Sequence, residues 1–219
     1  MPSVVWAVVV ARVANGAKSR LASALDPAER RALAVAMLAD VVTACAAAPD
    51  VLNGVVAVVD DPEAAATAEA AGALAIYDTR PNDMNAAASR GLACAARNGA
   101  GAAILLPGDI PLLSHSDLRT IVAAARDADR AVVIGASRDG QGTNALFLRP
   151  VDAIAPAFGP PSVDRHVALA HAAGAQTVVL ADLDLSLDID TPADLSVLAR
   201  RRVGLHTTSV LHHLLAATR

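Results

Sequence analysis

The segment AAILLPGDIPL, residues 102–112, indicates the fold most clearly. It begins with an apolar run, Ala102–Leu106, of the length and composition typical of a strand buried on both faces of a sheet. Pro107-Gly108-Asp109 breaks this run, and Ser114-His115-Ser116-Asp117 follows with the composition of a helix cap. A buried strand, a turn and a capped helix in this order are the repeating unit of an α/β fold.

The same unit recurs on both sides of this segment. Further strands are expected at Val4–Val10, Val55–Val59, Leu74–Tyr77, Ala131–Ile134, Ala145–Leu148 and Thr177–Leu180. Helices are expected from the Asp26 cap to about Ala47, at Pro62–Ala71 and Asn85–Arg97, from Ser114 to near Arg126, from a Ser162 cap to Gly174, from the Thr191 cap to about Arg202, and at Thr207–Ala217. This alternation predicts a doubly wound, mostly parallel sheet with helices on both faces. No repeat or linker divides the chain, so residues 1–219 are predicted to form one domain.

The composition of the chain limits the kinds of ligand and partner that the protein is expected to bind. Apolar residues make up 54% of the chain but aromatic residues only 2%, so an aromatic platform for nucleic acid is not expected. The net charge of −4, with no basic run, also favours a small, locally held anion over nucleic acid. Cys45 and Cys94 lack metal-ligand spacing and indicate buried residues in a reducing compartment. Without a signal-like start or a long apolar run, we expect a cytoplasmic protein that does not bind membranes.

The loop after the first strand carries three cations, Arg12, Lys18 and Arg20. Ligands of doubly wound sheets bind beyond the carboxyl ends of the strands, so residues in such loops are the candidates for the site. A loop with these side chains can wrap a triphosphate, with Lys18 and Arg20 offsetting its charge. The alternative is a solvated basic loop with Leu21 packed inward.

Three aspartates also follow predicted strands. Asp109 lies between prolines, and a hard carboxylate there suits Mg²⁺, although it could equally cap a turn. Asp188 and Asp190 are spaced to point to the same side of an extended segment, where they repel unless a cation lies between them. The dipole of the next helix explains Asp190 but not Asp188. One divalent ion could bridge all three aspartates and a triphosphate.

Two further segments concern a second ligand. Gly140-Gln141-Gly142-Thr143-Asn144 is a glycine-rich loop with exposed N–H groups and a hydroxyl. Phe158-Gly159-Pro160-Pro161-Ser162 leads into a helix, whose N-terminus is an anion site. Arg165 and His166 follow on its first turn, and His166 could equally be a surface histidine. Each segment alone is compatible with an ordinary turn or cap.

These motifs, in this order, resemble the CofC/FbiD guanylyltransferases of coenzyme F-420 biosynthesis. The segments that carry the resemblance are Ala17–Leu21 (AKSRL), Asp109–Leu112 (DIPL), Gly142–Leu146 (GTNAL), Phe158-Gly159 with Ser162 and His166, and Asp188–Leu195 (DIDTPADL). They span nearly the whole chain. The chain departs from the family at three positions: Val10 and Arg12 stand where Pro and Lys are usual, and Met84 precedes Asn85 in place of Leu.

The resemblance implies a sugar-nucleotidyltransferase-like fold and a role for each candidate residue. Mg²⁺, or Mn²⁺, is expected on Asp109, Asp188 and Asp190. The phospho-acid is expected on Thr143, Gly159 and Ser162. The nucleotide is expected near five residues: Arg12, Lys18, Arg20, Asn85 and Pro107. Lys18, Arg20 and Asp109 are expected to be catalytic.

The implied reaction transfers GMP from GTP to 2-phospho-L-lactate, phosphoenolpyruvate or 3-phospho-D-glycerate and releases pyrophosphate. A downstream transferase would join the product to a deazaflavin precursor. Two alternatives stay open: a molybdopterin-type nucleotidyltransferase, whose glycine-rich, arginine-containing start is missing here, and a non-catalytic nucleotide-binding regulator, which would not need the Asp188/Asp190 pair. A dehydrogenase fits poorly, because no GxGxxG follows the first strand.

Overall fold

The computed structural model describes residues 4–14, 18–78, 83–125, 128–181 and 183–217. Its seven strands form one sheet in the order β3-β2-β1-β4-β6-β5-β7. Their bounds are β1 Val5–Ala11, β2 Gly54–Val59, β3 Leu74–Tyr77, β4 Ala102–Pro107, β5 Ala131–Ala136, β6 Thr143–Arg149 and β7 Gln176–Leu180. Strand β6 runs antiparallel to its neighbours β4 and β5, and the other pairs are parallel. The predicted mostly parallel sheet is therefore confirmed.

The helices also follow the predicted order. They are α1 Pro27–Ala46, α2 Pro62–Ala70, α3 Met84–Arg97, α4 His115–Ala124, α5 Ser162–Ala172, α6 Pro192–Leu198 and α7 Leu205–Ala217, with short 3₁₀ turns at Ser19–Leu21 and Asp184–Ser186. The predicted helix end near Arg126 and the motif residue Ala17 lie outside the described residues. Helix α6 is shorter than predicted, because the chain turns after Leu198 to begin α7.

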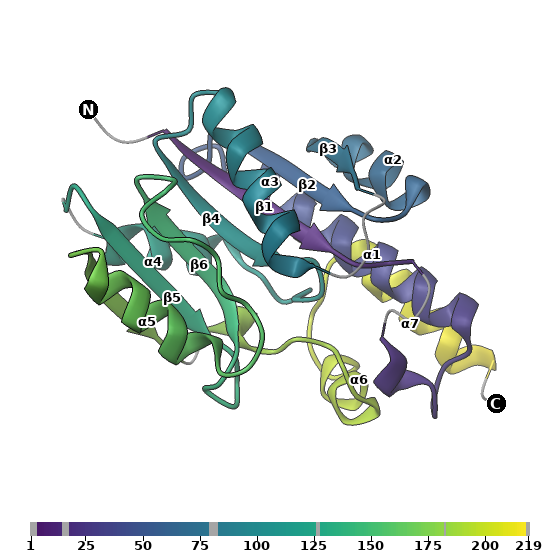
Figure 1. The fold of residues 1–219 in the computed structure, drawn as a ribbon. Coiled ribbons are helices and arrows are strands. Elements are labelled where there is room, and N and C mark those ends of the chain that lie inside the picture. The colour runs from purple at the N-terminus through teal and green to yellow at the C-terminus, as the bar shows by residue number, and fades with distance from the viewer. Residues whose placement is uncertain (1–3, 15–17, 79–82, 126–127, 182, 218–219) are drawn as a thin grey trace.

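Helices cover both faces of the sheet because its strands are apolar on both sides (Figure 1). In β1, Val5, Ala7 and Val9 face a core shared with α1, α2 and α4. The alternating residues Val8 and Val10 face a second core shared with α3 and α5. The predicted two helix layers are thus confirmed, and the two cores are almost entirely aliphatic.

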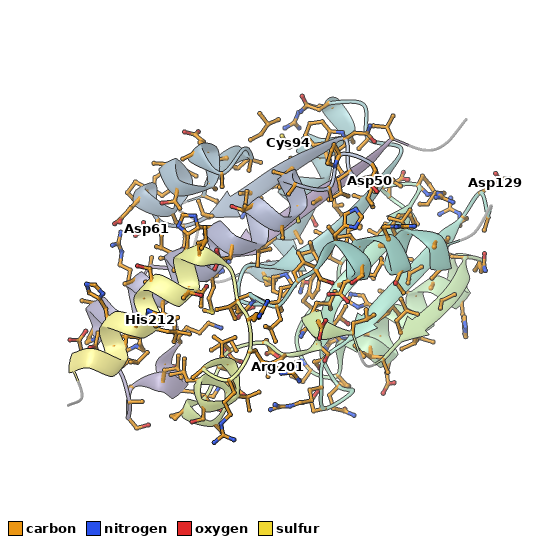
Figure 2. The ribbon with its side chains drawn as sticks, turned by 180° about the vertical axis from the view of Figure 1, so that it is seen from behind. Asp50, Asp61, Cys94, Asp129, Arg201 and His212 are labelled. Atoms are coloured by element: carbon orange, nitrogen blue, oxygen red, sulfur yellow. The ribbon has the colours of Figure 1, made fainter. Side chains whose placement is uncertain are left out.

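A third apolar cluster joins α1, α6 and α7. Figure 2 shows α7, with His212 labelled, lying along α1. The buried carboxylate of Asp40 in α1 accepts hydrogen bonds from the backbone N–H groups of His206 (3.1 Å) and Thr207 (2.8 Å). The C-terminal helix therefore packs on its own chain. In the described chain, no helix is long and apolar enough to cross a membrane.

The direction of β6 determines which residues meet at the edge of the sheet. Leu105 of β4 pairs with Leu146 of antiparallel β6, so the start of β6 lies beside the end of β4. Thr143 at the start of β6 and Asp109 after the end of β4 consequently reach the same edge.

Candidate active site

Two cavities adjoin at this edge of the sheet. The larger, of about 440 Å³, is lined by residues that include Arg20, Thr143, Gly159, Ser162 and Asp188. The smaller, of about 170 Å³, is lined by Val10, Ala11, Arg12, Lys18, Ala34, Met84, Pro107, Gly108, Asp109 and Asp190. Asp190 lines both cavities, so its carboxylate marks their junction.

Lys18 lies at the junction between two carboxylates. Its ammonium donates hydrogen bonds to Asp109 and to Oδ1 of Asp190 (2.8 Å), and its side chain is only 8% exposed. Burial alone would lower the pKa of Lys18, but the two carboxylates outweigh it and raise the pKa. Lys18 also has a left-handed backbone (φ 54°), which costs a non-glycine residue about 1 kcal/mol. Strain of this kind is typical of functional sites.

Arg20 reaches Asp190 from the larger cavity. Its guanidinium donates to Oδ2 of Asp190, and 70% of its side chain is exposed. Arg20 does not line the smaller cavity with Arg12 and Pro107, although all three were expected near the nucleotide. It instead faces the residues that were expected to bind the phospho-acid.

The spacing of Asp188 and Asp190 has the predicted effect. The side chain of Ile189 between them is fully buried, and its N–H donates to the carbonyl of Asp109 (3.1 Å). Asp188 and Asp190 therefore both face the larger cavity. Burial, followed by the charges of Asp109 and Asp190, raises the pKa of the Asp188 carboxyl.

Two of the three carboxylates have oxygens that no cation contacts among the described residues. Oδ1 of Asp109 is buried and has no hydrogen-bond partner among the described residues. Oδ1 of Asp188 lies 3.5 Å from the amide of Asn144, which also donates to two backbone carbonyls. The described residues contain no group of three or more acidic, His or Cys side chains gathered tightly enough to hold a metal ion, and Lys18 bridges Asp109 and Asp190. The chemistry of Asp109 and Asp188 nevertheless suits a hard cation.

Two buried hydroxyl groups line one wall of the larger cavity, and a buried imidazole lies behind them. Ser162 Oγ donates to Thr143 Oγ1 (3.0 Å), and Nδ1 of His166 lies 3.0 Å from the same oxygen. His166 is fully buried, so its interpretation as a surface histidine is wrong. Its Nε2 accepts from the N–H of Ala157 (3.0 Å).

The expectation that Ser162 caps α5 is also wrong. Pro161 is the N-cap, Ser162 is the first helical residue, and this helix start has no side-chain cap in the described chain. The physical reason is that the Ser162 hydroxyl bonds to Thr143 across the cavity wall. The first-turn N–H groups of α5 are consequently not covered by a capping side chain.

Asn85 contacts the loop that carries Gly159. Its Oδ1 accepts from the N–H of Phe158 (2.6 Å), and its Nδ2 donates to the carbonyl of Phe158 (3.3 Å). Gly159 has φ +101°, a conformation that L side chains rarely adopt, and lines the larger cavity. Asn85, which the resemblance placed near the nucleotide, thus also contacts the loop that lines the larger cavity.

Sequence reasoning missed Asp60 and Arg138. The carboxylate of Asp60 accepts from the N–H groups of Val13 (2.7 Å) and Ala14 (3.1 Å) and lies 4.0 Å from Arg12. It thereby organises the loop after β1. Asp60 directly follows β2, so the rule that post-strand residues form the site could have found it. Arg138 lines the larger cavity and pairs with Asp194 (2.9 Å).

The fold and the position of this site define a class. The chain superposes on a crystal structure of a protein from Desulfovibrio desulfuricans G20 described as a nucleotide-diphospho-sugar transferase, with a TM-score of 0.74 and 16% identity, over 97% of this chain and 95% of that one. This likeness shows the fold. The chain thus has a nucleotidyltransferase-like α/β fold, and both cavities lie where such sheets bind their ligands.

Sequence comparison identifies the family within this class. The profile described as "Guanylyl transferase CofC like" matches residues 5–217. The chain is 39% identical over 215 residues to the phosphoenolpyruvate guanylyltransferase of Conexibacter woesei, covering 96% of each chain. It is also 39% identical over 210 residues to the 3-phospho-D-glycerate guanylyltransferase of Phenylobacterium zucineum, covering 95% of each. The chain belongs to the CofC-like guanylyltransferase family and is a nucleotidyltransferase, as the resemblance implied.

Proposed function

We propose that this enzyme transfers GMP from GTP to the phosphate of a three-carbon phospho-acid. A phosphate oxygen of the acid attacks the α-phosphorus of GTP, and the bond from that phosphorus to the bridging oxygen breaks. Pyrophosphate leaves, and the product joins the acid to guanosine through a diphosphate. The observation that carries this proposal is that two cavities meet at the Lys18–Asp190 ion pair. The nucleotide and the phospho-acid can then each occupy one cavity, with their reacting groups at the junction.

The smaller cavity would hold part of the nucleotide. Arg12, Lys18 and Pro107 line it. Its volume of about 170 Å³ suits a base or a phosphate group and not a whole GTP, so the nucleotide would extend along the edge of the sheet.

The larger cavity would hold the phospho-acid. Thr143 offers its hydroxyl, Ser162 lines the same wall and donates to Thr143, and Gly159 leaves room for a close approach of the ligand. The start of α5 has no capping side chain in the described chain, but its Val163 N–H already donates to the carbonyl of Gln141 (3.3 Å). The N–H groups of Ser162 and Asp164 would therefore be the ones that favour an anion. Arg20 would offset the charge of the acid and of the α-phosphate together.

Lys18 and Arg20 would carry most of the catalytic effect. The attacking phosphate is already an anion, so no residue needs to act as a covalent nucleophile. Catalysis then consists of positioning two anions and neutralising the charge that develops between them. Lys18 and Arg20 both contact Asp190, so their positions are coupled through one carboxylate.

A divalent cation, Mg²⁺ or Mn²⁺, would complete the site. Asp109 and Asp188 are the first candidates to hold it, because Oδ1 of Asp109 lacks a protein partner and Asp188 contacts no cation among the described residues. Asp190 is the third candidate, although Lys18 and Arg20 already contact both of its oxygens. When bound, such an ion supplies positive charge to the phosphate oxygens.

The wider role follows from the family. The two relatives named above act, by their names, on phosphoenolpyruvate and on 3-phospho-D-glycerate, and each is 39% identical to this chain. We therefore propose a phospho-acid of this class, with 2-phospho-L-lactate as the third candidate, and a place in coenzyme F-420 biosynthesis in the cytoplasm. A transferase that uses the product would be the functional partner. Residues 1–219 would act as one domain, since one sheet builds both cavities.

Pyrophosphate release tests this function. The protein is incubated with Mg²⁺, with GTP, ATP, CTP or UTP, and with each of the three phospho-acids. We expect release with GTP and at least one acid, and Asp109→Asn should lose at least about a hundredfold in kcat while keeping its fold. Release with no pair, from folded protein, would favour the non-catalytic alternative, and full activity of Asp109→Asn would remove Asp109 from the metal site.

A further inference from the structure

His166 occupies a position that determines its protonation state. Its ring is fully buried, and the backbone N–H of Ala157 points at Nε2 over 3.0 Å. A backbone N–H can only donate, so Nε2 must accept and carries no proton. A neutral imidazole has one N–H, which must then be on Nδ1.

This proton determines the hydrogen bonding of Thr143. Nδ1–H of His166 points at Thr143 Oγ1 (3.0 Å), and the hydroxyl of Ser162 donates to the same oxygen (3.0 Å). Thr143 Oγ1 therefore accepts two hydrogen bonds, which occupy both of its lone pairs. Its own hydrogen has no further acceptor among the described residues, and Thr143 lines the larger cavity.

We propose that His166 is a positioning residue that fixes the Thr143 hydroxyl as a hydrogen-bond donor toward an anionic group of the acceptor substrate. The inference rests on the proposed binding of the phospho-acid in the larger cavity. His166 itself does not line that cavity. It would determine whether the Thr143 hydroxyl, which does line the cavity, donates or accepts a hydrogen bond there.

The surroundings of His166 favour this single state. Burial, with a smaller contribution from the nearby Arg165, lowers the pKa of His166 to about 4, so the ring stays neutral near pH 7. A doubly protonated ring would place Nε2–H against the N–H of Ala157. The ring also forms a T-shaped pair with Phe158, with centroids 5.3 Å apart and planes at 79°, which limits its rotation.

The tautomer is measured directly by ¹⁵N NMR of the histidine rings in the full chain near pH 7. Assignment uses His166→Phe, whose spectrum lacks only the His166 signals. We expect His166 to carry its proton on Nδ1 and none on Nε2. A proton on Nε2, alone or with one on Nδ1, would overturn the inference.

Kinetics tests whether His166 acts through Thr143. His166→Phe should raise the KM for the phospho-acid that is turned over by roughly tenfold to a hundredfold and leave the KM for GTP within about twofold. The matched control is His171→Phe, which replaces an exposed histidine on the same helix and should change neither KM.

A double-mutant cycle separates positioning from a general structural role. Thr143→Val should raise the same KM about tenfold in the wild-type background but less than about threefold in the His166→Phe background, since the oriented hydroxyl is already lost. Effects that simply multiply would overturn the inference. If His166→Phe does not fold, His166→Leu, which likewise cannot donate to Thr143, replaces it in the cycle with the same expectation.

The two proposals fail in different ways. If Thr143→Val and Ser162→Ala both leave the KM for every phospho-acid unchanged, the proposed acceptor site is wrong, and the inference about His166 falls with it. If those variants raise this KM but His166→Phe does not, the acceptor site stands and only the inference about His166 is wrong.

Discussion

At the scale of single residues, three carboxylates and two cationic side chains lie at the junction of the cavities. The cations are shared unevenly among the carboxylates. Among the described residues, Lys18 bridges Asp109 and Asp190, and Arg20 contacts only Asp190. Asp188 is left with a marginal contact to Asn144 and with two negative neighbours, which together with burial raise its pKa. This repulsion lowers the stability of the protein when no ligand is bound, a cost that is common at functional sites.

Asp188→Asn should therefore stabilise the protein and inactivate it. At pH 7 we expect the free energy of unfolding to rise by roughly 0.5–2 kcal/mol, because a buried repelled charge is removed, and kcat to fall at least about a hundredfold. The raised pKa means that wild-type stability falls as the pH rises through it, so the advantage of the variant should shrink as the pH is lowered toward about 4. Urea unfolding at several pH values measures this difference. A variant less stable than the wild type at pH 7 would contradict the account.

At the scale of elements, the docking of α7 on α1 depends on one buried carboxylate. Asp40 accepts from two N–H groups at the start of α7, so it serves as the cap of a helix that is remote in sequence. Gly204 approaches so closely that an added Cβ would lie 2.2 Å from the Asp40 carboxyl. The two helices therefore meet at a point without space for a side chain.

Asp40→Ala should cost about 2–4 kcal/mol of unfolding free energy, because the buried N–H of Thr207 and the partly buried N–H of His206 lose their acceptor. The matched control is Asp26→Ala, which removes the exposed cap of α1 and should cost about 1 kcal/mol. Urea unfolding measures both values. Equal losses for the two variants would mean that Asp40 acts no more strongly than an ordinary surface cap.

At the scale of the whole molecule, the smaller cavity is lined mainly by segments next to β1 and β4, and the larger mainly by segments next to β6 and α5. Asn85, at the start of α3, connects the helix that packs on β1 and β2 to the loop at Phe158 that walls the larger cavity. This link joins segments 73 residues apart.

Asn85→Ala should therefore raise the KM for the phospho-acid about tenfold, with a change of less than about threefold for GTP, because two hydrogen bonds to the acceptor loop are lost. Ser89→Ala is the control, since it removes an exposed hydroxyl from the same helix. Steady-state kinetics with each substrate varied in turn measures the two effects. A larger rise in the KM for GTP than in the KM for the phospho-acid would instead place Asn85 in the nucleotide site, as the resemblance implied.

Most local features were predictable because they depend on neighbouring residues. Asp26 and Thr191 form capping boxes with Glu29 and Asp194, as the spacing of these residues indicated. The alternation of Asp188, Ile189 and Asp190 likewise placed both aspartates on one side. The order of strands and helices followed from runs of apolar residues and their breaks.

The sequence by itself thus determined the α/β class, the family and most of the residues at the edge of the sheet. The tertiary structure decided how they meet: β6 runs antiparallel, which brings Thr143 beside Asp109, and Lys18 joins aspartates 91 and 172 residues away. It also buried His166, which the sequence left equally compatible with the surface. The physical reason is that caps and periodicity act within a few residues, whereas strand direction, burial and ion pairing arise only when distant segments pack together.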